Sequence, residues 1–406
     1  MDTPSPIRVV IIGGGIAGLA TAVALRSQID LVNDIARLID KDRAVDTHNV
    51  TVEVYEQWKA EPKSSGGDCD DLGQLVRSSS AGGLQLGPNG MRALQLVRDG
   101  LDEKWIRRGH PCNGMRFRNE TGAELCVLEQ QHVDHESNRY KLPAVTGRRA
   151  SLLSLLEEEC RDLGVCIHYG AKVESILLVR PDQVEQPDDG RRKTKKPQSK
   201  VSVSFANCEQ PILADLVIGA DGVHSRARAY VSPETVPEYT GIVGFGGFMD
   251  GACCPPIVTE SDLPDRSKLE MQFGPIGFFG FGVGHTHKIS FSTRKSSSSL
   301  TSSASSPSSA FGTSPCSESE IGQSIMWWST VPMEGIAAPD LKSMSDVEAI
   351  QLLRETHRGW AGPSGRILCA AKERGDPIVK TMIHDVRNLS SWHGCDGRLG
   401  MSCSAL

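Results

Sequence analysis

The chain has 406 residues, of which 39% are hydrophobic, so it is long enough for two domains or for one large composite domain. Its net charge of −6 at pH 7 is mild and its basic residues are scattered, which argues against a nucleic-acid-binding surface. The twelve cysteines form no CxxC pair and no Cys/His ligand spacing, so we expect reduced thiols, a reducing compartment and no metal site.

The first predicted element is a buried strand, Val9 to Ile12, that runs into a glycine turn and a helix (VVIIGGGIAGLATAVAL). Gly13 allows the tight turn, Gly15 lets the backbone approach a pyrophosphate, and Gly18 lets helix and strand pack closely. The phosphates would lie at the N-terminus of the helix. The pattern predicts a dinucleotide site, which we assign to Gly13, Gly15, Ala17 and Gly18. A purely structural glycine turn is the alternative.

The strand begins within ten residues of Met1, so we expect no signal peptide. No apolar stretch is long enough for a membrane span. We therefore expect a cytoplasmic protein, and peripheral association with a membrane surface stays open.

A second strand is predicted over Val50 to Glu56 (VTVEVYE), and its last residue is acidic. Such a residue binds the ribose hydroxyls and disfavours a 2′-phosphate, so NAD or FAD fits better than a phosphorylated ribose. An ordinary exposed carboxylate at a strand end is the alternative. Before this strand, Leu31, Ile35 and Leu38 have helical spacing, which predicts an extended helix and a loop.

The polar segment 60–80 is predicted to be a surface loop, and a short strand, a turn and a helix are predicted within 81–97. Gly82 and Gly83 stand just before that strand. They would let the backbone pass close to a flat ligand, and a plain loop explains them equally well.

Strand and hairpin patterns occupy 113–145, and Ser151 to Leu163 is predicted to be an amphipathic helix followed by a strand at Val165 to His168. Arg148 and Arg149 stand just before this helix. Since arginines oppose the dipole at a helix N-terminus, they need a local partner. A ligand phosphate or ribityl group and a neighbouring carboxylate are equal candidates.

Two segments of low complexity, 181–200 and 296–320, each interrupt a pair of strands and are predicted to be disordered loops. The basic run at 191–196 resembles a localisation or anion-binding signal. A solvated loop is the simpler explanation.

A further strand is predicted within Ala214 to Val231, and it ends at Asp221 and Gly222. Ser225 and Arg228 follow at the start of a helix. An acidic residue at the carboxyl end of such a strand is where an open α/β sheet binds its ligand.

Together these motifs resemble the class A FAD-dependent monooxygenases of the salicylate hydroxylase-like and zeaxanthin epoxidase-like type, in their fungal form. GGGIAGLATAVAL with Glu56 resembles the FAD-binding start of that family, and AGGLQLGPNGMRAL resembles the segment that passes the flavin. GRRASLLSLL resembles its arginine–leucine helix, which makes Arg149 the flavin-contacting arginine. The most specific match is ADGVHSRAR to the motif DGxxSxxR. Its residues are Asp221, Gly222, Ser225 and Arg228.

The resemblance implies a mixed α/β fold: a discontinuous Rossmann-like FAD-binding domain with an inserted substrate domain built on a mainly antiparallel β-sheet. We expect the FAD-binding domain over 1–100, 141–235 and 385–406, and the substrate domain over 101–140 and 236–384. The family continues after a GR pair into a strand and a Gly-Asp motif that contacts FAD. Here SWHGCDGR is followed by LGMSCSAL, and Asp396 precedes the GR pair. We therefore expect an FAD-binding domain that is C-terminally incomplete and lacks this strand.

The resemblance also implies the chemistry. NADH or NADPH would reduce bound FAD, and O2 would then form a C4a-hydroperoxyflavin that hydroxylates or epoxidises a small aromatic substrate or alkene. Tyr239 is a candidate catalytic phenol. The candidate walls of an apolar pocket are aromatic, with membership in the core as the alternative: Phe278, Phe279, Phe281, Trp327 and Trp328. An inactive or unstable truncated member of the family and an NAD-dependent Rossmann oxidoreductase are the alternative functions.

Overall fold

The computed structural model describes residues 6–39, 50–59, 82–129, 142–180, 199–208, 210–249, 257–259, 261–287, 322–387, 389–394 and 397–401. The loops expected at 60–80 and 296–320 lie outside these residues, as do the basic run at 191–196 and Asp396. Residues 181–198 also lie outside them. Lys200 was expected to be in that loop, but it begins a strand, because it pairs with Val179 in an antiparallel ladder.

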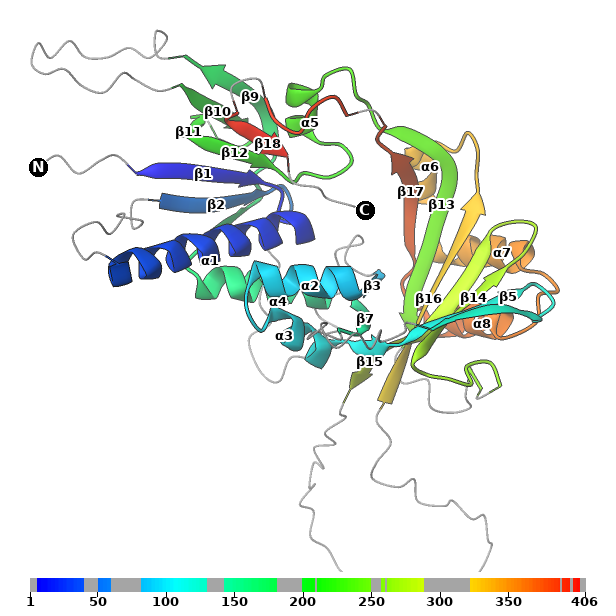
Figure 1. Ribbon diagram of the computed structural model, residues 1–406. Coiled ribbons are helices and arrows are strands. Elements are labelled where there is room, and N and C mark those ends of the chain that lie inside the picture. Colours follow the sequence, from blue (N-terminus) through cyan, green and yellow to red (C-terminus); the bar gives the residue numbers. More distant parts are fainter. Residues whose placement is uncertain are drawn as a thin grey trace, which may run out of the picture.

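A parallel five-stranded sheet, sheet A, forms the first part of the molecule (Figure 1). In spatial order its strands are β18 (Leu399–Met401), β12 (Leu216–Gly219), β1 (Ile7–Ile12), β2 (Val50–Glu56) and β8 (Cys166–Tyr169). Val9 and Ile11 pack in one hydrophobic cluster, whereas Val10 and Ile12 pack in another. Burial on both faces of the sheet explains why β1 is an unbroken apolar run.

Four helices lie on one side of sheet A, and a small antiparallel sheet lies on the other (Figure 1). The helices are α1 (Ile16–Ile39), α2 (Pro88–Val97), α3 (Leu101–Arg108) and α4 (Arg149–Asp162). The antiparallel sheet consists of β9 (Val173–Val179), β10 (Lys200–Phe205) and β11 (Ile212–Ala214), and α5 (Arg226–Val231) packs beside it.

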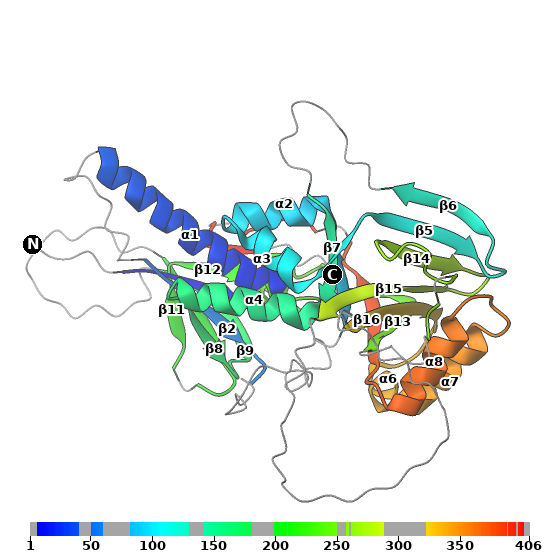
Figure 2. The same cartoon turned by 90° about the horizontal axis from the view of Figure 1, so that it is seen from below.

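A seven-stranded sheet, sheet C, forms the second part of the molecule. In spatial order its strands are β17 (Val379–Asp385), β13 (Glu238–Met249), β16 (Gly322–Pro332), β15 (Phe278–His287), β14 (Lys268–Phe273), β5 (Gly114–Asn119) and β6 (Glu124–Glu129). Every neighbouring pair is antiparallel except β14 and β5. The helices α6 (Ala338–Ser343), α7 (Asp346–Thr356) and α8 (Ser364–Arg374) lie on the side of sheet C away from α1 to α4 (Figures 1 and 2).

A three-stranded sheet connects the two parts. It consists of β3 (Gly83–Leu86), β7 (Ala144–Arg148) and β4 (His110–Cys112). Cys112 and Ala144 of this sheet share a small core cluster with Phe248 and Met326 of sheet C. The hydroxyl of Thr146 also donates to the carbonyl of Val283, 2.8 Å away, so β7 is bonded directly to β15.

The structure confirms the expected fold class, with parallel strands in the first part and mainly antiparallel strands in the second. The expected strand at Val50–Glu56 and the expected helix at Ser151–Leu163 are also confirmed, the latter beginning at Arg149. Helix α3 was assigned to the substrate domain, but Leu101 and Trp105 pack in the core of the first part. A boundary after Arg108 therefore fits the packing better than one at residue 101.

The expectation that the C-terminal strand is missing is wrong. Leu399–Met401 forms β18, which pairs in parallel with β12 through Val217, Ile218 and Gly219. The segment contains a glycine and only three paired residues, so its sequence carries no strand pattern. The open edge of β12 provides the hydrogen-bonding partners that the local sequence does not predict.

Among the described residues, no helix combines the length and the apolar character needed to cross a bilayer. Within the same part of the chain, no three or more His, Cys, Asp or Glu side chains are grouped so as to hold a metal ion.

Candidate cofactor site

In the glycine turn after β1, two glycines are closely packed against the backbone and a third borders open space. Gly13 has a φ of 104°, and a Cβ there would overlap the carbonyl of Ala220. A Cβ at Gly18 would overlap the carbonyl oxygen of Gly13, whereas a Cβ at Gly15 would have no protein atom within 4 Å. Ala17 packs at the margin of the first core cluster. Gly13 and Gly18 are therefore required by the fold, and Gly15 leaves room for a ligand.

Glu56 ties this turn to the end of β2. Its Oε2 accepts a hydrogen bond from the backbone N–H of Gly14 at 2.6 Å, and its Oε1 accepts a hydrogen bond from the backbone N–H of Trp58 at 2.9 Å. The side chain is only 7% exposed, so the alternative of an ordinary exposed carboxylate is wrong. Each carboxylate oxygen has a further lone pair with which it could accept a ribose hydroxyl.

The DGxxSxxR segment builds the start of α5. Asp221 accepts hydrogen bonds from the Ser225 hydroxyl at 2.5 Å and from the backbone N–H of Arg226 at 2.6 Å. The Ser225 oxygen accepts the N–H of Arg228 at 2.8 Å and caps the helix. The buried Arg228 guanidinium in turn donates to the carbonyl of Val223 at 2.6 Å. The motif therefore has a clear structural role, and its contact with a ligand stays a prediction.

Two glycines fix the position of this segment against the sheet. Gly222 has a φ of 76°, a left-handed conformation that favours glycine. A Cβ at Gly219 would overlap the Cβ of Ala227, so α5 packs directly against the end of β12. Since Gly13 also packs against Ala220 and the backbone of Asp221, the motif adjoins the glycine turn.

Arg149 brings the start of α4 to the same region. Its backbone N–H donates to the carbonyl of Gly82 at 2.9 Å. Burial lowers the pKa of Arg149, although the negative charge of Glu56 acts in the opposite direction. Arg148 instead points its guanidinium over the Phe248 ring, 4.1 Å from the centroid. The two adjacent arginines therefore face different surroundings, and Arg149 is the one that lies near the expected site.

Gly82 and Gly83 have different roles. A Cβ at Gly82 would meet nothing within 4 Å, as at Gly15, whereas a Cβ at Gly83 would overlap the side chain of Met326 in sheet C. Gly83 thus permits the contact between the two parts of the molecule. This role could not be predicted from the sequence, because Met326 is far away along the chain.

The structure therefore gathers most of the expected cofactor residues at the carboxyl ends of β1, β2 and β12. Open space at Gly15 and Gly82, an acidic side chain at Glu56 and a cation at Arg149 fit a dinucleotide with a pyrophosphate and an unphosphorylated ribose.

Tyr239 lies at the start of β13, where its hydroxyl donates to the carbonyl of Met333 at 2.9 Å. Desolvation raises its pKa above the ordinary value. Its ring centroid is 5.7 Å from that of His384, and His384 is the same distance from His224 in the DGxxSxxR segment. Tyr239 is thus connected to the cofactor region through His384, and its catalytic role stays a prediction.

The aromatic residues expected to line a pocket fall on two faces of sheet C. Phe279, Phe281 and Trp327 are at most 4% exposed and pack in the cluster that includes α7 and α8, which confirms the alternative of core membership for these three. Phe278 and Trp328 are their neighbours on β15 and β16 and project from the opposite face, because side chains alternate along a strand. That face looks toward the first part of the molecule (Figure 1).

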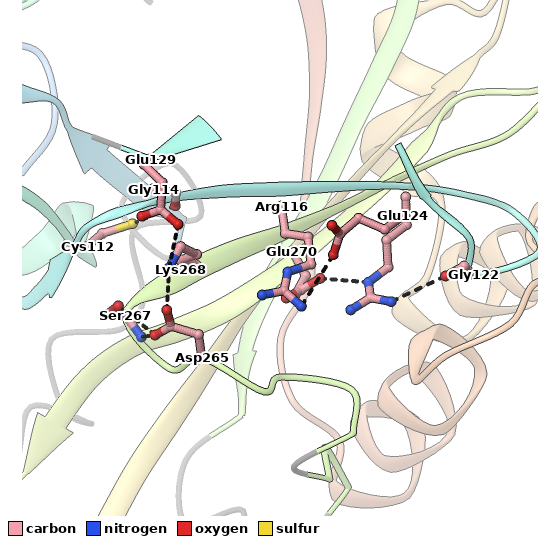
Figure 3. Close-up of polar contacts among 11 residues, drawn as sticks. Cys112, Gly114, Arg116, Gly122, Glu124, Glu129, Asp265, Ser267, Lys268 and Glu270 are labelled. Atoms are coloured by element: carbon pink, nitrogen blue, oxygen red, sulfur yellow. Dashed lines mark hydrogen bonds and ion pairs between the residues drawn. The ribbon is translucent and has the colours of Figure 1, made fainter. Parts of the chain in front are cut away.

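A buried ionic network on β5 and β14 was not expected from the sequence (Figure 3). Glu270 is 1% exposed and accepts a hydrogen bond from Arg118 at 3.0 Å, while Arg116 lies 3.5 Å from its other oxygen. Burial raises the pKa of Glu270 despite these cations. Lys268, on the same face, bridges Asp265 and Glu129. The alternation in KLEMQF was the one signal that could have indicated this polar face.

Comparison with known proteins shows relationships over most of the chain. The FAD-dependent monooxygenase OpS4 of Beauveria bassiana is 27% identical over 244 residues, which cover 59% of this chain and 43% of that protein. The aurachin C monooxygenase/isomerase of Stigmatella aurantiaca is 24% identical over 290 residues, covering 71% of this chain and 57% of that protein. The chain is a relative of the FAD-dependent monooxygenases. It spans about half the length of these two relatives. No family model matches it.

Solved structures of FAD complexes share the fold. Klebsiella pneumoniae HpxO, complexed with FAD and uric acid, superposes with a TM-score of 0.60 at 18% identity, covering 97% of this chain and 72% of that one. CtdE, in complex with FAD and a substrate, gives a TM-score of 0.60 at 14% identity, covering 97% and 73%.

Proposed function

We propose that this chain binds FAD at the carboxyl ends of β1, β2 and β12 and acts as a monooxygenase that uses NADH or NADPH and O2. The observation that carries the proposal is the hydrogen bond from Gly14 to Glu56, which holds the glycine turn against the acidic end of β2. The same turn packs on the backbone of Asp221. Three segments far apart in the sequence thus form one site suited to an adenosine diphosphate group.

Different residues of the chain would bind different parts of FAD. The open backbone at Gly15 and the N-terminus of α1 would hold the pyrophosphate, and Glu56 would accept the ribose hydroxyls. Gly82 would let β3 approach the ring system, with Arg149 beside it, and the segment from Asp221 to Arg228 would complete the site. When bound, FAD would supply the redox chemistry, taking a hydride from the nicotinamide and passing one oxygen atom of O2 to the substrate.

The two parts would have separate tasks. The parallel sheet with α1 to α5 would form the FAD-binding domain, and sheet C with α6 to α8 would form the substrate domain. The face of sheet C that carries Phe278 and Trp328 would receive a small apolar or aromatic substrate, because an apolar wall excludes water from the reacting groups. HpxO, one of the proteins with this fold, is complexed with uric acid, which is also a small ring compound.

The test compares two glycine-to-alanine variants. At both Gly15 and Gly365 an added Cβ would meet no protein atom within 4 Å, so neither variant should disturb the fold. Gly365→Ala should bind FAD like the wild type. Gly15→Ala should bind FAD at least about tenfold more weakly, because its methyl group would occupy the space of the pyrophosphate. The measurement is titration of the purified proteins with FAD, followed by flavin absorbance.

Equal FAD affinity in the two variants would contradict this site. If the wild type binds FAD without consuming NADH or NADPH in the presence of candidate aromatic substrates, the chain is a flavin-binding protein without the proposed activity. Saturable binding of NAD with no uptake of FAD would favour the Rossmann oxidoreductase instead.

A further inference from the structure

A hollow of about 360 Å³ is lined by residues of α7, of α8 and of the segment between them. These helices lie on the side of sheet C away from α1 to α4 (Figure 1). The lining of the hollow contains three arginines and no acidic residue. The residues are Arg354, His357, Arg358, Gly359, Trp360, Gly362, Gly365, Arg366, Leu368 and Cys369. Nothing in the proposed monooxygenase reaction uses them.

Two of the three arginines carry charge that the described part of the chain does not neutralise. The Arg366 guanidinium pairs with Asp262, whereas the guanidinium groups of Arg354 and Arg358 form no ion pair or hydrogen bond with any described residue. Both are exposed, Arg354 in the last turn of α7 and Arg358 two residues after the helix ends, and their like charges repel. The negative end of the α7 dipole offsets part of this cost, and an anion between the two guanidinium groups would remove the rest.

The start of α8 faces the same hollow. Its N-cap is Pro363, and no side chain caps the helix. Gly362 and Gly365, on either side of the first turn, both line the hollow without bulky side chains. The N–H groups of an uncapped first turn favour an anion, so this end of α8 adds to the effect of the arginines.

His357, which lines the hollow, has a buried ring nitrogen with no partner among the described residues. It is 5% exposed, and its Nε2 lies 2.8 Å from the Ser329 hydroxyl, which donates its own proton to the carbonyl of Phe278. Nε2 therefore carries the ring proton and Nδ1 is an acceptor. Nδ1 is buried and has no partner among the described residues. A buried acceptor without a partner is costly, and a donor from a ligand would satisfy it.

We propose that this hollow binds a small organic anion that also carries a hydroxyl or N–H group. The anionic groups pair with Arg354, Arg358 and the first turn of α8, and the donor reaches Nδ1 of His357. Trp360 packs edge-on against the imidazole, with ring centroids 4.4 Å apart, so its indole shifts when the donor enters. The site does not depend on flavin binding.

The experiment is calorimetric titration of the full chain with citrate, which has three carboxylates and a hydroxyl, and with tricarballylate, which lacks the hydroxyl. We expect saturable citrate binding, weaker tricarballylate binding and a change in tryptophan emission. The double variant Arg354→Gln/Arg358→Gln should lose at least about tenfold in citrate affinity. The matched control, Lys342→Gln/Lys372→Gln, removes two exposed charges of α6 and α8 outside the hollow and should stay within about twofold.

As a control, circular dichroism should show that both double variants are folded, because all four side chains are exposed. Three outcomes would overturn the proposal: no saturable binding of citrate by the wild type, equal affinity in the two double variants, or equal affinity for citrate and tricarballylate. Gly15→Ala should bind citrate like the wild type, which separates this site from the cofactor site.

Discussion

At the scale of single residues, Glu56 has a structural role in the fold and, in the proposed site, would also bind the ribose. It accepts backbone hydrogen bonds from Gly14 and Trp58 and is almost fully buried. The N-terminus of α1 and the guanidinium of Arg149 lie near this carboxylate, and both are positive. A carboxylate held in this way is already oriented before a ribose arrives.

Substitution of Glu56 separates these roles. Glu56→Gln keeps an oxygen that can accept from Gly14 but loses the charge and the acceptor for Trp58, so it should cost about 1 kcal/mol of stability, less than Glu56→Ala. Because a hydrogen bond to a charged group contributes about 1.5–3 kcal/mol, FAD affinity should fall roughly 10- to 100-fold. Glu56→Ala should lose both affinity and stability. A flavin titration that shows wild-type affinity for both variants would contradict the assignment of Glu56 to the ribose.

His357 predicts a dependence of stability on pH. Burial lowers the pKa of this imidazole from 6.5 to about 4, so between these values the unfolded chain binds a proton that the folded chain does not. Stability is therefore fully present above pH 6.5 and falls as the pH decreases toward 4, by about 3 kcal/mol in all.

Urea unfolding across this pH range tests the effect. His357→Gln should be less stable at pH 7 but should have a flatter pH profile, whereas His224→Gln, which changes an exposed histidine, should keep the steep wild-type profile. Parallel profiles for wild type and His357→Gln would show that another group causes the loss of stability in acid.

At the scale of elements, the Asp221 carboxylate organises the beginning of α5. It bonds the Ser225 hydroxyl and the first N–H groups of the helix, and Ser225 caps the helix in turn. The helix has only six residues, so it depends on this cap and on its packing against β12.

Asp221→Ala should therefore cost about 1–2 kcal/mol of stability through the lost cap and should also weaken FAD retention. Asp221→Asn keeps one acceptor oxygen and should recover part of the stability. If flavin occupancy is unchanged in both variants, Asp221 acts on the helix alone and its assignment to the cofactor site is wrong.

Elements with strong local patterns were predictable from the sequence. The apolar run of β1, the glycine turn and the alternation of Val50, Val52 and Val54 each set a backbone conformation through nearby residues, and all appear as predicted. In contrast, β18 forms because β12 offers an open edge, which no local pattern shows.

The candidate site was likewise predictable where it depends on local patterns, and not where it depends on distant strands. The grouping of Gly13, Glu56 and Asp221 was predicted from the glycine turn, from the acidic residues at two strand ends and from the resemblance of the DGxxSxxR segment. The aromatic pairs on β15 and β16 did not reveal which member faces the core, because Phe278–Phe279 and Trp327–Trp328 place a large ring on each face. Gly83 and the Glu270 network depend on partners from distant strands, and their roles required the structure.

At the scale of the whole molecule, FAD binding should stabilise the fold. A ligand that binds the folded chain at one hundred times its dissociation constant adds about 2.7 kcal/mol. We expect FAD to raise the unfolding temperature of the wild type and of Gly365→Ala, and to have little effect on Gly15→Ala. Riboflavin, which lacks the pyrophosphate and adenosine, should give a much smaller shift. Equal shifts with FAD and riboflavin would show that the glycine turn and Glu56 do not contact the cofactor.

The order of the strands has a consequence for how the chain folds during synthesis. The strands of sheet A are spread along the chain from Ile7–Ile12 to Leu399–Met401. Those of sheet C are spread from Gly114–Asn119 to Val379–Asp385. No contiguous fragment contains all strands of one sheet without also containing strands of the other. In addition, β12 keeps an exposed edge until Leu399–Met401 has left the ribosome. Such long-range pairing slows folding and leaves strand edges open to other chains. The yield of soluble protein should therefore depend on temperature and on chaperones more steeply than the stability of the folded molecule does.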